Sequence, residues 1–512
     1  MRRKIFLLLL VLLGSLTLVA CGGNKDNNKV RKTVISYCGW DLGSDSAPSI
    51  KRKMIEKFNE SHPTIYIEMV EPQGNYDEFI NTLAYAGNLP DVFLVNSVAN
   101  TVAANYAMDI TLFAEADEEW ENVNVSLRES CTYYDSVYAI PSAQNYLGLF
   151  ANYTLINDEA NISKDAEEMF AAGDYTYEQL ISTIKAVNKV DAQDGSGFVG
   201  YGNTGSMISW LPSVLDSQLA NPKGVMHYIW DGEKLDMNGE TMIKALEIIN
   251  DLGNPNADYT YQALAPAEGE DDMRETIFGV AGEQAVFQAG RMAFFEAASY
   301  YTFDEKNMDF DWEFVALPNG KVIAALDYLC ISKATVRPDE AFEVAKFMTY
   351  GADGINTRYE VVDENEELSL SGLPINTDME VSGKWFDYVG LPGVKEVYEK
   401  VSEGKITVIV EPNKTTPGYL QARFHQKTGV VIEGLRGDAE YAIGDFVWDV
   451  SLGSVTVSQY RAAMTDELEA LINKNITDAY SAIKAIVDAD RPNRVAPKVP
   501  EVEAPEAPEV TE

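Results

Sequence analysis

Histidine is scarce in this 512-residue chain, and several familiar catalytic patterns are missing. The three histidines, His62, His227 and His425, are scattered, so the sequence supports neither a zinc site nor a histidine-based triad. The patterns GxxxxGK(S/T), HExxH and GxSxG do not occur. We therefore expect no enzyme activity, no metal and no cofactor.

Cysteine is also rare. Only Cys38, Cys131 and Cys330 follow Cys21, which belongs to the N-terminal segment treated below. Three is an odd number, too few for a disulfide framework, and none forms a CxxC pair. We expect buried thiols with at most one optional bridge.

Basic side chains are outnumbered by acidic ones: the chain has 40 Lys and Arg and 80 Asp and Glu, which gives a formal charge of −40. Loss of residues 1–20 would remove three basic side chains and bring the charge to −43. Such a field repels nucleic acid and anionic headgroups. An acidic, well-solvated exterior explains this composition without implying a cationic ligand.

The N-terminus combines a basic start, Met1 to Lys4, with an apolar run over residues 5–13 and the sequence Leu18-Val19-Ala20-Cys21. The apolar run is short for a membrane span, so residues 1–20 are interpreted as a cleaved signal peptide. The Leu-Val-Ala-Cys order resembles a bacterial lipobox, in which the cysteine is lipidated; a chance cysteine is the alternative. Residues 21–32 would then tether the protein to the outer face of the cell membrane.

A chain of this length is too long to fold around a single hydrophobic core, so two lobes or several domains are expected. Residues 33–95 alternate strand and helix patterns, with strands at 33–38, 65–71 and 92–95. This is the start of a doubly wound α/β fold. Asn96 and Ser97 follow the third strand, at the sheet edge where ligands bind.

Further elements are expected along the rest of the chain. Helices are expected at 103–110, 176–190, 242–252, 284–290, 339–350, 460–472 and 477–487, and strands at 147–152, 292–295, 314–317 and ending at 201. Residues 491–512 repeat Pro, Val, Ala and Glu and are expected to be a disordered acidic tail.

Residues 195–200 fit GxGxxG, but they follow a helix and precede a strand, the reverse of a dinucleotide site. A calcium loop before Gly195 would need oxygen ligands at alternate positions, and Ala192 and Val190 supply none.

An ordered set of motifs runs through two-thirds of the chain. It comprises the lipobox, FNESHP at 58–63, AGNLPDV at 86–92, VYAIP at 137–141, GRMAFF at 290–295 and EAFEVAKF at 340–347. In this order the motifs resemble the extracellular solute-binding proteins of ABC importers, in the carbohydrate-binding group (family 1) that includes maltose-binding protein.

The resemblance implies a two-lobed periplasmic-binding-protein-like fold with three interlobe crossings, near Ser142, near Leu326 and at 372–374. Lobe one would hold 33–142 with 327–372, and lobe two 143–326 with 373–490. It further implies a monomer that closes on a sugar or oligosaccharide and delivers it to an ABC permease.

The resemblance also implies which residues contact the ligand. Tyr300 stands where the family often carries a stacking tryptophan. Aromatic faces and paired hydrogen-bonding groups suit sugars. For the tryptophans, packing inside a lobe is the alternative role, and helix capping is the alternative for Asp41 and Asn96. The implied set is Trp40, Asp41, Asn96, Ser97, Gln144, Asn145, Trp210, Glu296, Tyr300 and Asp327.

Two other functions stay open at this point. A surface glycoside hydrolase or lyase needs only two carboxylates near each other, which an acidic chain always provides. The same fold could instead bind a peptide or a polyamine, which the acidity permits.

Overall fold

The computed structural model describes residues 31–498, apart from 45, 163, 172, 218–229, 232–233, 255, 267–269, 302 and 304–307. Residues 1–30 and 499–512 lie outside the described residues. The expected signal peptide, Cys21, most of the tether and most of the acidic tail therefore fall outside them.

The first part of the chain is built as expected. The strands β1, β4 and β5 pair in parallel in the order β4-β1-β5, and the helices between them carry apolar faces that pack on the sheet. The predicted doubly wound start is confirmed. The elements are β1 (Thr33–Cys38), η1 (Trp40–Leu42), β2 (Gly43–Ser44), β3 (Ala47–Pro48), α2 (Ile50–Ser61), β4 (Ile65–Met69), α3 (Tyr76–Tyr85), β5 (Val92–Val95) and α4 (Val98–Ala103).

The expected helix at 103–110 is wrong. Helix α4 ends at Ala103, and Asn105 takes a left-handed conformation with φ of 63°, which stops the helix. Ala107, Met108 and Ile110 are buried in an extended segment instead, with Ala107 bridged to Ser332. The apolar spacing there reflects a buried loop, which periodicity alone does not distinguish from a short helix.

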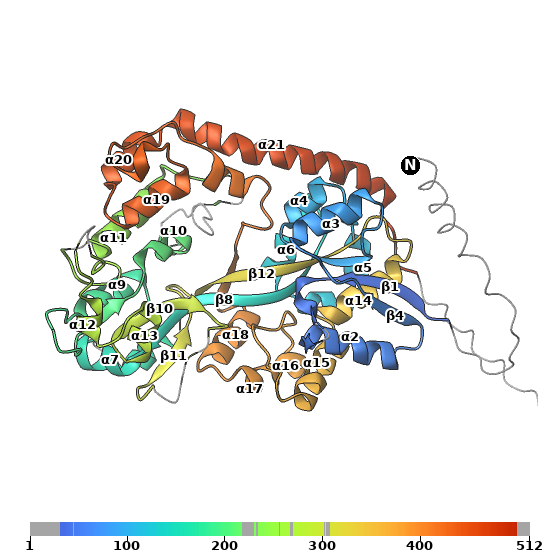
Figure 1. The fold of residues 1–512 in the computed structure, drawn as a ribbon, viewed down its shortest axis with the longest axis horizontal. Helices are drawn as coiled ribbons and strands as arrows, with labels where there is room; N and C mark the ends of the chain where they lie inside the picture. The colour runs from blue at the N-terminus through green and yellow to red at the C-terminus, as the bar shows by residue number, and fades with distance from the viewer. Residues whose placement is uncertain are drawn as a thin grey trace, which may run out of the picture.

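Two long antiparallel strands run through the middle of the molecule (Figure 1). β8 (Ile140–Asn152) and β12 (Lys321–Ile331) pair with each other, with Gln144 opposite Leu326 and Ala143 opposite Asp327. The far end of β12 pairs with β5, and the far end of β8 pairs with β10 (Met292–Ala298) and β11 (Trp312–Val315). One curled sheet, in the order β4-β1-β5-β12-β8-β10-β9 with β9 at Val199–Tyr201, thus joins both halves of the mixed α/β fold.

The segment at 372–374 joins the same place. Leu373 N–H donates to Gln144 O at 2.8 Å, and the Gln144 side-chain amide donates to Pro374 O. The three segments expected to cross between lobes therefore lie side by side at Gln144.

The remaining elements complete two hydrophobic cores. One core, called the β1 core below, extends from the β1 half of the sheet along β8 to β10 and β11, and the other lies wholly in the half that holds Trp210. The elements are α5 (Thr111–Ala116), η2 (Glu118–Asn122), α6 (Val125–Ser130), β6 (Thr132–Tyr133), β7 (Ser136–Val137), α7 (Tyr153–Glu159), α8 (Ala166–Phe170), α9 (Tyr177–Ala186), β9 (Val199–Tyr201), η3 (Thr204–Ser209), α10 (Leu211–Ser217), α11 (Glu240–Leu252), α12 (Arg274–Phe278), α13 (Glu283–Gln288), α14 (Pro338–Met348), α15 (Ala352–Glu364), α16 (Met379–Ser382), α17 (Trp385–Val389), α18 (Val394–Ser402), β13 (Thr407–Val410), η5 (Gln421–His425), η6 (Arg436–Asp438), α19 (Ile443–Ser451), α20 (Val457–Ala463), α21 (Asp466–Asp490) and η7 (Arg491–Asn493).

Helix α21 connects the two cores. The sequence predicted helices at 460–472 and 477–487, but the structure has the short α20 and then one continuous helix, capped by the Thr465 side chain. Ile472 and Ile476 belong to the Trp210 core, whereas Ile483 and Val487 belong to the β1 core. Figure 1 shows this helix running along one side of the molecule from one half to the other.

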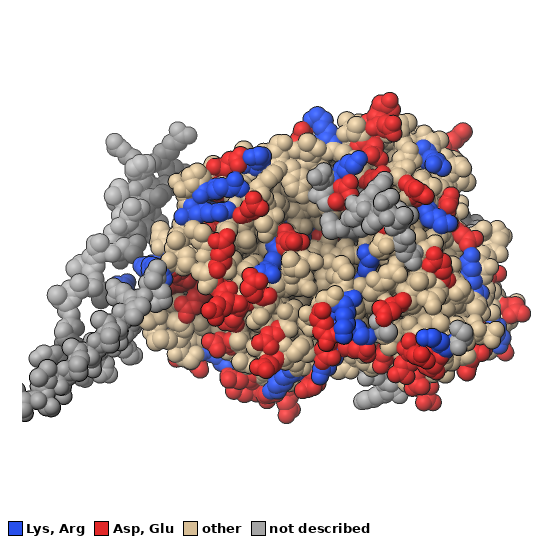
Figure 2. All heavy atoms as spheres, turned by 180° about the vertical axis from the view of Figure 1, so that it is seen from behind, with Lys and Arg blue, Asp and Glu red and all other residues tan. Residues whose placement is uncertain are grey.

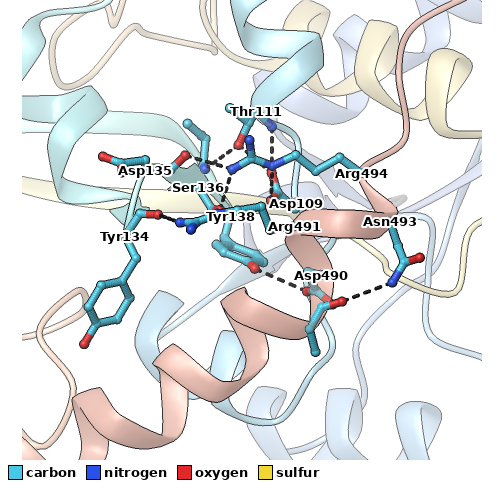
Figure 3. Close-up of polar contacts among 12 residues, drawn as sticks. Asp109, Thr111, Tyr134, Asp135, Ser136, Tyr138, Asp490, Arg491, Asn493 and Arg494 are labelled. Atoms are coloured by element: carbon cyan, nitrogen blue, oxygen red, sulfur yellow. Dashed lines mark hydrogen bonds and ion pairs between the residues drawn. The ribbon is translucent and has the colours of Figure 1, made fainter.

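The end of α21 is fixed to the β6–β7 hairpin (Figure 3). Asp490 accepts hydrogen bonds from Tyr138 Oη at 3.2 Å and from Lys333. Arg494 Nε donates to the buried Asp109 at 2.8 Å, and its Nη2 donates to Ser136 Oγ at 2.7 Å. The segment expected to be disordered from 491 thus begins with residues that contact the β1 half.

Within the described residues, no helix is both long enough and apolar enough to cross a membrane. Cys38, Cys131 and Cys330 are free and buried.

Candidate functional site

The carboxyl end of β1 carries Trp40 and Asp41 into the short helix η1. Trp40 is partly exposed and packs edge-to-face on Tyr76, with ring centroids 4.8 Å apart. Asp41 accepts a hydrogen bond from Tyr37 Oη at 3.3 Å and lies 4.0 Å from Lys51 Nζ. Burial raises the pKa of Asp41.

The carboxyl end of β5 carries Asn96 and Ser97. Ser97 Oγ accepts from Asn100 N as the N-cap of α4 and donates to Lys414 O at 3.3 Å. The Asn96 amide donates to Asp77 at 2.9 Å. Both line a pocket of about 180 Å³ between α3 and α4. Of the two residues, Ser97 rather than Asn96 caps the helix.

The central strands place Gln144, Asn145 and Asp327 where the three segments meet. Gln144 is buried, and Gln144 Oε1 and Asn145 Oδ1 have no hydrogen-bond partner among the described residues. Asp327 accepts from Lys414 Nζ at 2.6 Å. Lys414 therefore links Asp327 and the start of α4.

In the other half, Glu296 lies half-buried on β10. Its carboxylate accepts hydrogen bonds from Trp210 Nε1 at 2.9 Å and from Tyr201 Oη. Burial raises the pKa of Glu296, and the bonds from Trp210 and Tyr201 act in the opposite direction. Trp210 is fully buried, so its ring packs inside the lobe and its N–H orients the carboxylate. Tyr300, four positions beyond Glu296, is 55% exposed.

Two exposed aromatic side chains of this half were missed by the sequence reasoning. Trp448 on α19 and Phe424 on η5 are both exposed, though less so than Tyr300. A Cβ at Gly205 would lie 3.0 Å from the Trp448 ring, so Trp448 covers η3, the element whose Ser206 also hydrogen-bonds Glu296. A tryptophan on the solvent side of an amphipathic helix is the signal that would have identified Trp448.

A pocket of about 440 Å³ collects two of the expected residues, Asp41 and Asp327, with Ser142 at the expected first crossing. The same pocket is lined by Lys51 and Arg358, which carry no sequence signature because each looks like an ordinary solvated helix residue. Glu296 and Tyr300 do not line it. The expected residues are thus distributed over several surfaces.

The two cations of this pocket are electrostatically unusual. Burial, followed by repulsion from Arg358, lowers the pKa of Lys51 to about 7. Burial lowers the pKa of Arg358 to about 10. Their setting contrasts with the face shown in Figure 2, on which acidic side chains are scattered widely with fewer basic ones between them.

Solved structures share the fold. A sugar transporter from Rhizobium etli in an open conformation matches with a TM-score of 0.59 at 14% identity, covering 86% of this chain and 99% of that one. An ABC substrate-binding protein from Listeria monocytogenes in complex with cycloalternan matches with a TM-score of 0.55 at 14% identity, covering 87% of this chain and 99% of that one. A cyclic alpha-maltosyl-1,6-maltose binding protein from Arthrobacter globiformis matches with a TM-score of 0.55 at 14% identity, covering 90% of this chain and 100% of that one.

The comparison with curated proteins finds no sequence match. The family model for the bacterial extracellular solute-binding protein matches residues 53–392, about two-thirds of the chain. The matched region includes β8, β12 and β10, the strands that carry Gln144, Asp327 and Glu296. The chain therefore belongs to the family of bacterial extracellular solute-binding proteins.

Proposed function

We propose that the protein is the substrate-binding lipoprotein of an ABC transporter, which captures a sugar or oligosaccharide between two lobes and delivers it to a membrane permease. Family membership supports the binding role. The sugar-binding descriptions of the structural neighbours support the ligand class. Lipidation at Cys21 would hold the protein at the outer face of the bacterial membrane.

The single observation that carries the ligand class is the group around Glu296. A carboxylate held by Trp210 and Tyr201 has fixed its orientation before any ligand arrives, and it retains lone pairs for hydroxyl groups. Exposed aromatic faces at Tyr300 and Trp448 suit the C–H faces of sugar rings.

The strands β8 and β12 and the segment at 372–374, which lie side by side at Gln144, would serve as the hinge between the two halves. A ligand that contacts both halves would favour a closed arrangement, because binding shifts the equilibrium toward the state with more contacts. The permease would then recognise that state.

A thermal-shift screen against sugars, oligosaccharides, peptides and polyamines tests the proposal. A ligand at a hundred times its dissociation constant adds about 2.7 kcal/mol to the free energy of unfolding. Stabilisation by peptides or polyamines alone would exclude a carbohydrate ligand. Turnover of a labelled oligosaccharide by the pure protein would favour the hydrolase alternative.

Variants locate the site. Tyr300→Ala removes an exposed ring and should weaken a sugar hit without changing the unliganded melting temperature. Tyr66→Ala, on the outer strand β4 and 45% exposed, is the matched control and should leave binding unchanged. If the two variants bind the sugar with equal affinity, Tyr300 does not contact the ligand.

A fractionation experiment tests the anchor. The full-length protein should partition with membranes, and Cys21→Ser should release it. Equal membrane association of both proteins would contradict lipidation at Cys21.

A further inference from the structure

We propose that the pocket lined by Lys51 and Arg358 binds a carboxylate of the ligand, so that the captured sugar is an acidic one such as a uronate oligosaccharide. This inference rests on the proposed sugar-binding function and specifies its substrate class. The experiment below separates the two.

Arg358 presents an unpaired guanidinium to the pocket. Its Cζ lies 4.9 Å from the centroid of the Trp385 ring, and its Nε donates only to Met54 Sδ at 3.5 Å. In the described part of the chain, no carboxylate lies within 4.0 Å of Arg358. A guanidinium stacked on an indole is held in one plane, which favours two parallel hydrogen bonds to a carboxylate.

Lys51 supplies a second cation at the same place. Its side chain is 13% exposed, its ammonium donates to Met348 O, and its carboxylate neighbour Asp41 is at the long distance of 4.0 Å. Burial together with Arg358 disfavours the charged form, as the lowered pKa shows. An incoming anion would relieve both effects, because it offers the ammonium a charged partner.

The carboxylates that line the pocket leave Arg358 without an ion pair among the described residues. Asp327 is neutralised by Lys414 at 2.6 Å, and Glu367 is exposed at the rim. Of the three lining carboxylates, Asp41, Asp327 and Glu367, Asp41 lies 4.0 Å from Lys51 Nζ, and none forms an ion pair with Arg358 within 4.0 Å. A guanidinium without an ion pair among the described residues is unusual in a chain of formal charge −40 and matches a single ligand carboxylate.

The size and the other lining groups favour a sugar acid over a bare ion. The volume of about 440 Å³ falls within the range of small-molecule pockets, about 300–1,000 Å³. Ser142, Ser369 and Ser371 add hydroxyl groups that can bond sugar hydroxyls. The pocket also contains Asp41 and Asp327, two of the residues that the family resemblance implies for ligand contact.

Calorimetry with the complete protein tests the inference, using trigalacturonate, its methyl ester and maltotriose as probes. The ester has the same rings without the charge. We expect the acid to bind at least about tenfold more tightly than the ester, the gain of a charge-assisted pair. The general acidity of the protein would oppose this preference, so a preference for the acid reports a specific site.

Variants of the two cations complete the test. Arg358→Gln and Lys51→Met should each reduce the ratio of acid to ester affinity toward one. Arg358→Lys should retain part of the preference for the acid. The control Arg337→Gln, at an exposed position of the same half, should leave the ratio unchanged. Melting temperatures of the unliganded variants report whether they fold. If Arg358→Gln does not fold, the acid-to-ester ratio of Arg358→Lys is compared with that of wild type instead.

Each outcome is decisive. Equal binding of acid and ester, or a preference that survives Arg358→Gln, overturns the inference while the proposed function stands. Stabilisation by sodium sulfate or phosphate equal to that by trigalacturonate also overturns it. Failure of all three sugars to bind, together with every other sugar of the screen, overturns the proposed function itself.

Discussion

Removing the Arg494 side chain tests whether the end of α21 is fixed to the other half of the molecule. Arg494→Gln eliminates the ion pair with Asp109 and the bonds to Asp135 O at 2.9 Å and Ser136 Oγ at 2.7 Å. The Asp109 side chain is only 3% exposed, so its charge would lose its cationic partner in a buried place.

The expected cost follows from that burial. Removing one partner of a buried pair typically costs about 3–5 kcal/mol. Here the Arg494 side chain is 19% exposed, and Thr111 N still donates to Asp109 at 3.0 Å. We therefore expect a loss of about 2–3 kcal/mol in the free energy of unfolding, below the range for a fully buried pair.

Urea unfolding followed by circular dichroism measures this loss, and hydrogen exchange of the α21 amides shows where it occurs. Lys474→Ala is the matched control: its pair with Asp478 lies on the same helix with side chains 65% and 63% exposed, and its loss should cost under about 0.5 kcal/mol. The reasoning is refuted if Arg494→Gln and Lys474→Ala have the same midpoint and the same exchange near residue 490.

Three further predictions concern stability and reactivity. Burial raises the pKa of Glu283 to about 7, so its stabilising contribution is complete below the unfolded value of about 4.3 and is lost as the pH rises through about 7. Glu283→Gln should gain stability relative to wild type between pH 5 and pH 8; parallel curves of melting temperature against pH would contradict this. Gly200→Ala would place its Cβ 2.1 Å from Ile184 O and should cost about 1–3 kcal/mol in urea unfolding, so an unchanged midpoint would be inconsistent with the structure. Beyond any thiol at position 21, Ellman's reagent at pH 8 should find no reactive cysteine before unfolding and three after it, because burial protects Cys38, Cys131 and Cys330; labelling of the folded protein would show that one is accessible.

The sequence predicted the elements whose pattern is strong and local. Residues 33–95 alternate between periods of 2 and 3.6, and each predicted strand and helix there has its counterpart in the structure. The prediction failed at 103–110, where a buried loop has apolar residues at helical spacing, and at α21, where two apolar patches belong to one helix that serves two cores.

The candidate site was only partly accessible to the same reasoning. Trp210 and Tyr300 both matched aromatic positions of the family, and only packing shows that one is fully buried behind Glu296 while the other faces solvent. Lys51 and Arg358 resemble solvated helix residues until α2 and α15 pack together beside Asp41.

The sequence by itself determined the family, the mixed α/β class and the acidic character, because ordered motifs, short-range periodicity and composition are properties of the chain. The tertiary structure alone decided which charges share a pocket, which aromatic rings remain exposed, and that α21 fastens one half to the other. These features depend on contacts between residues hundreds of positions apart, and such contacts are set by how whole faces pack, which no local pattern encodes.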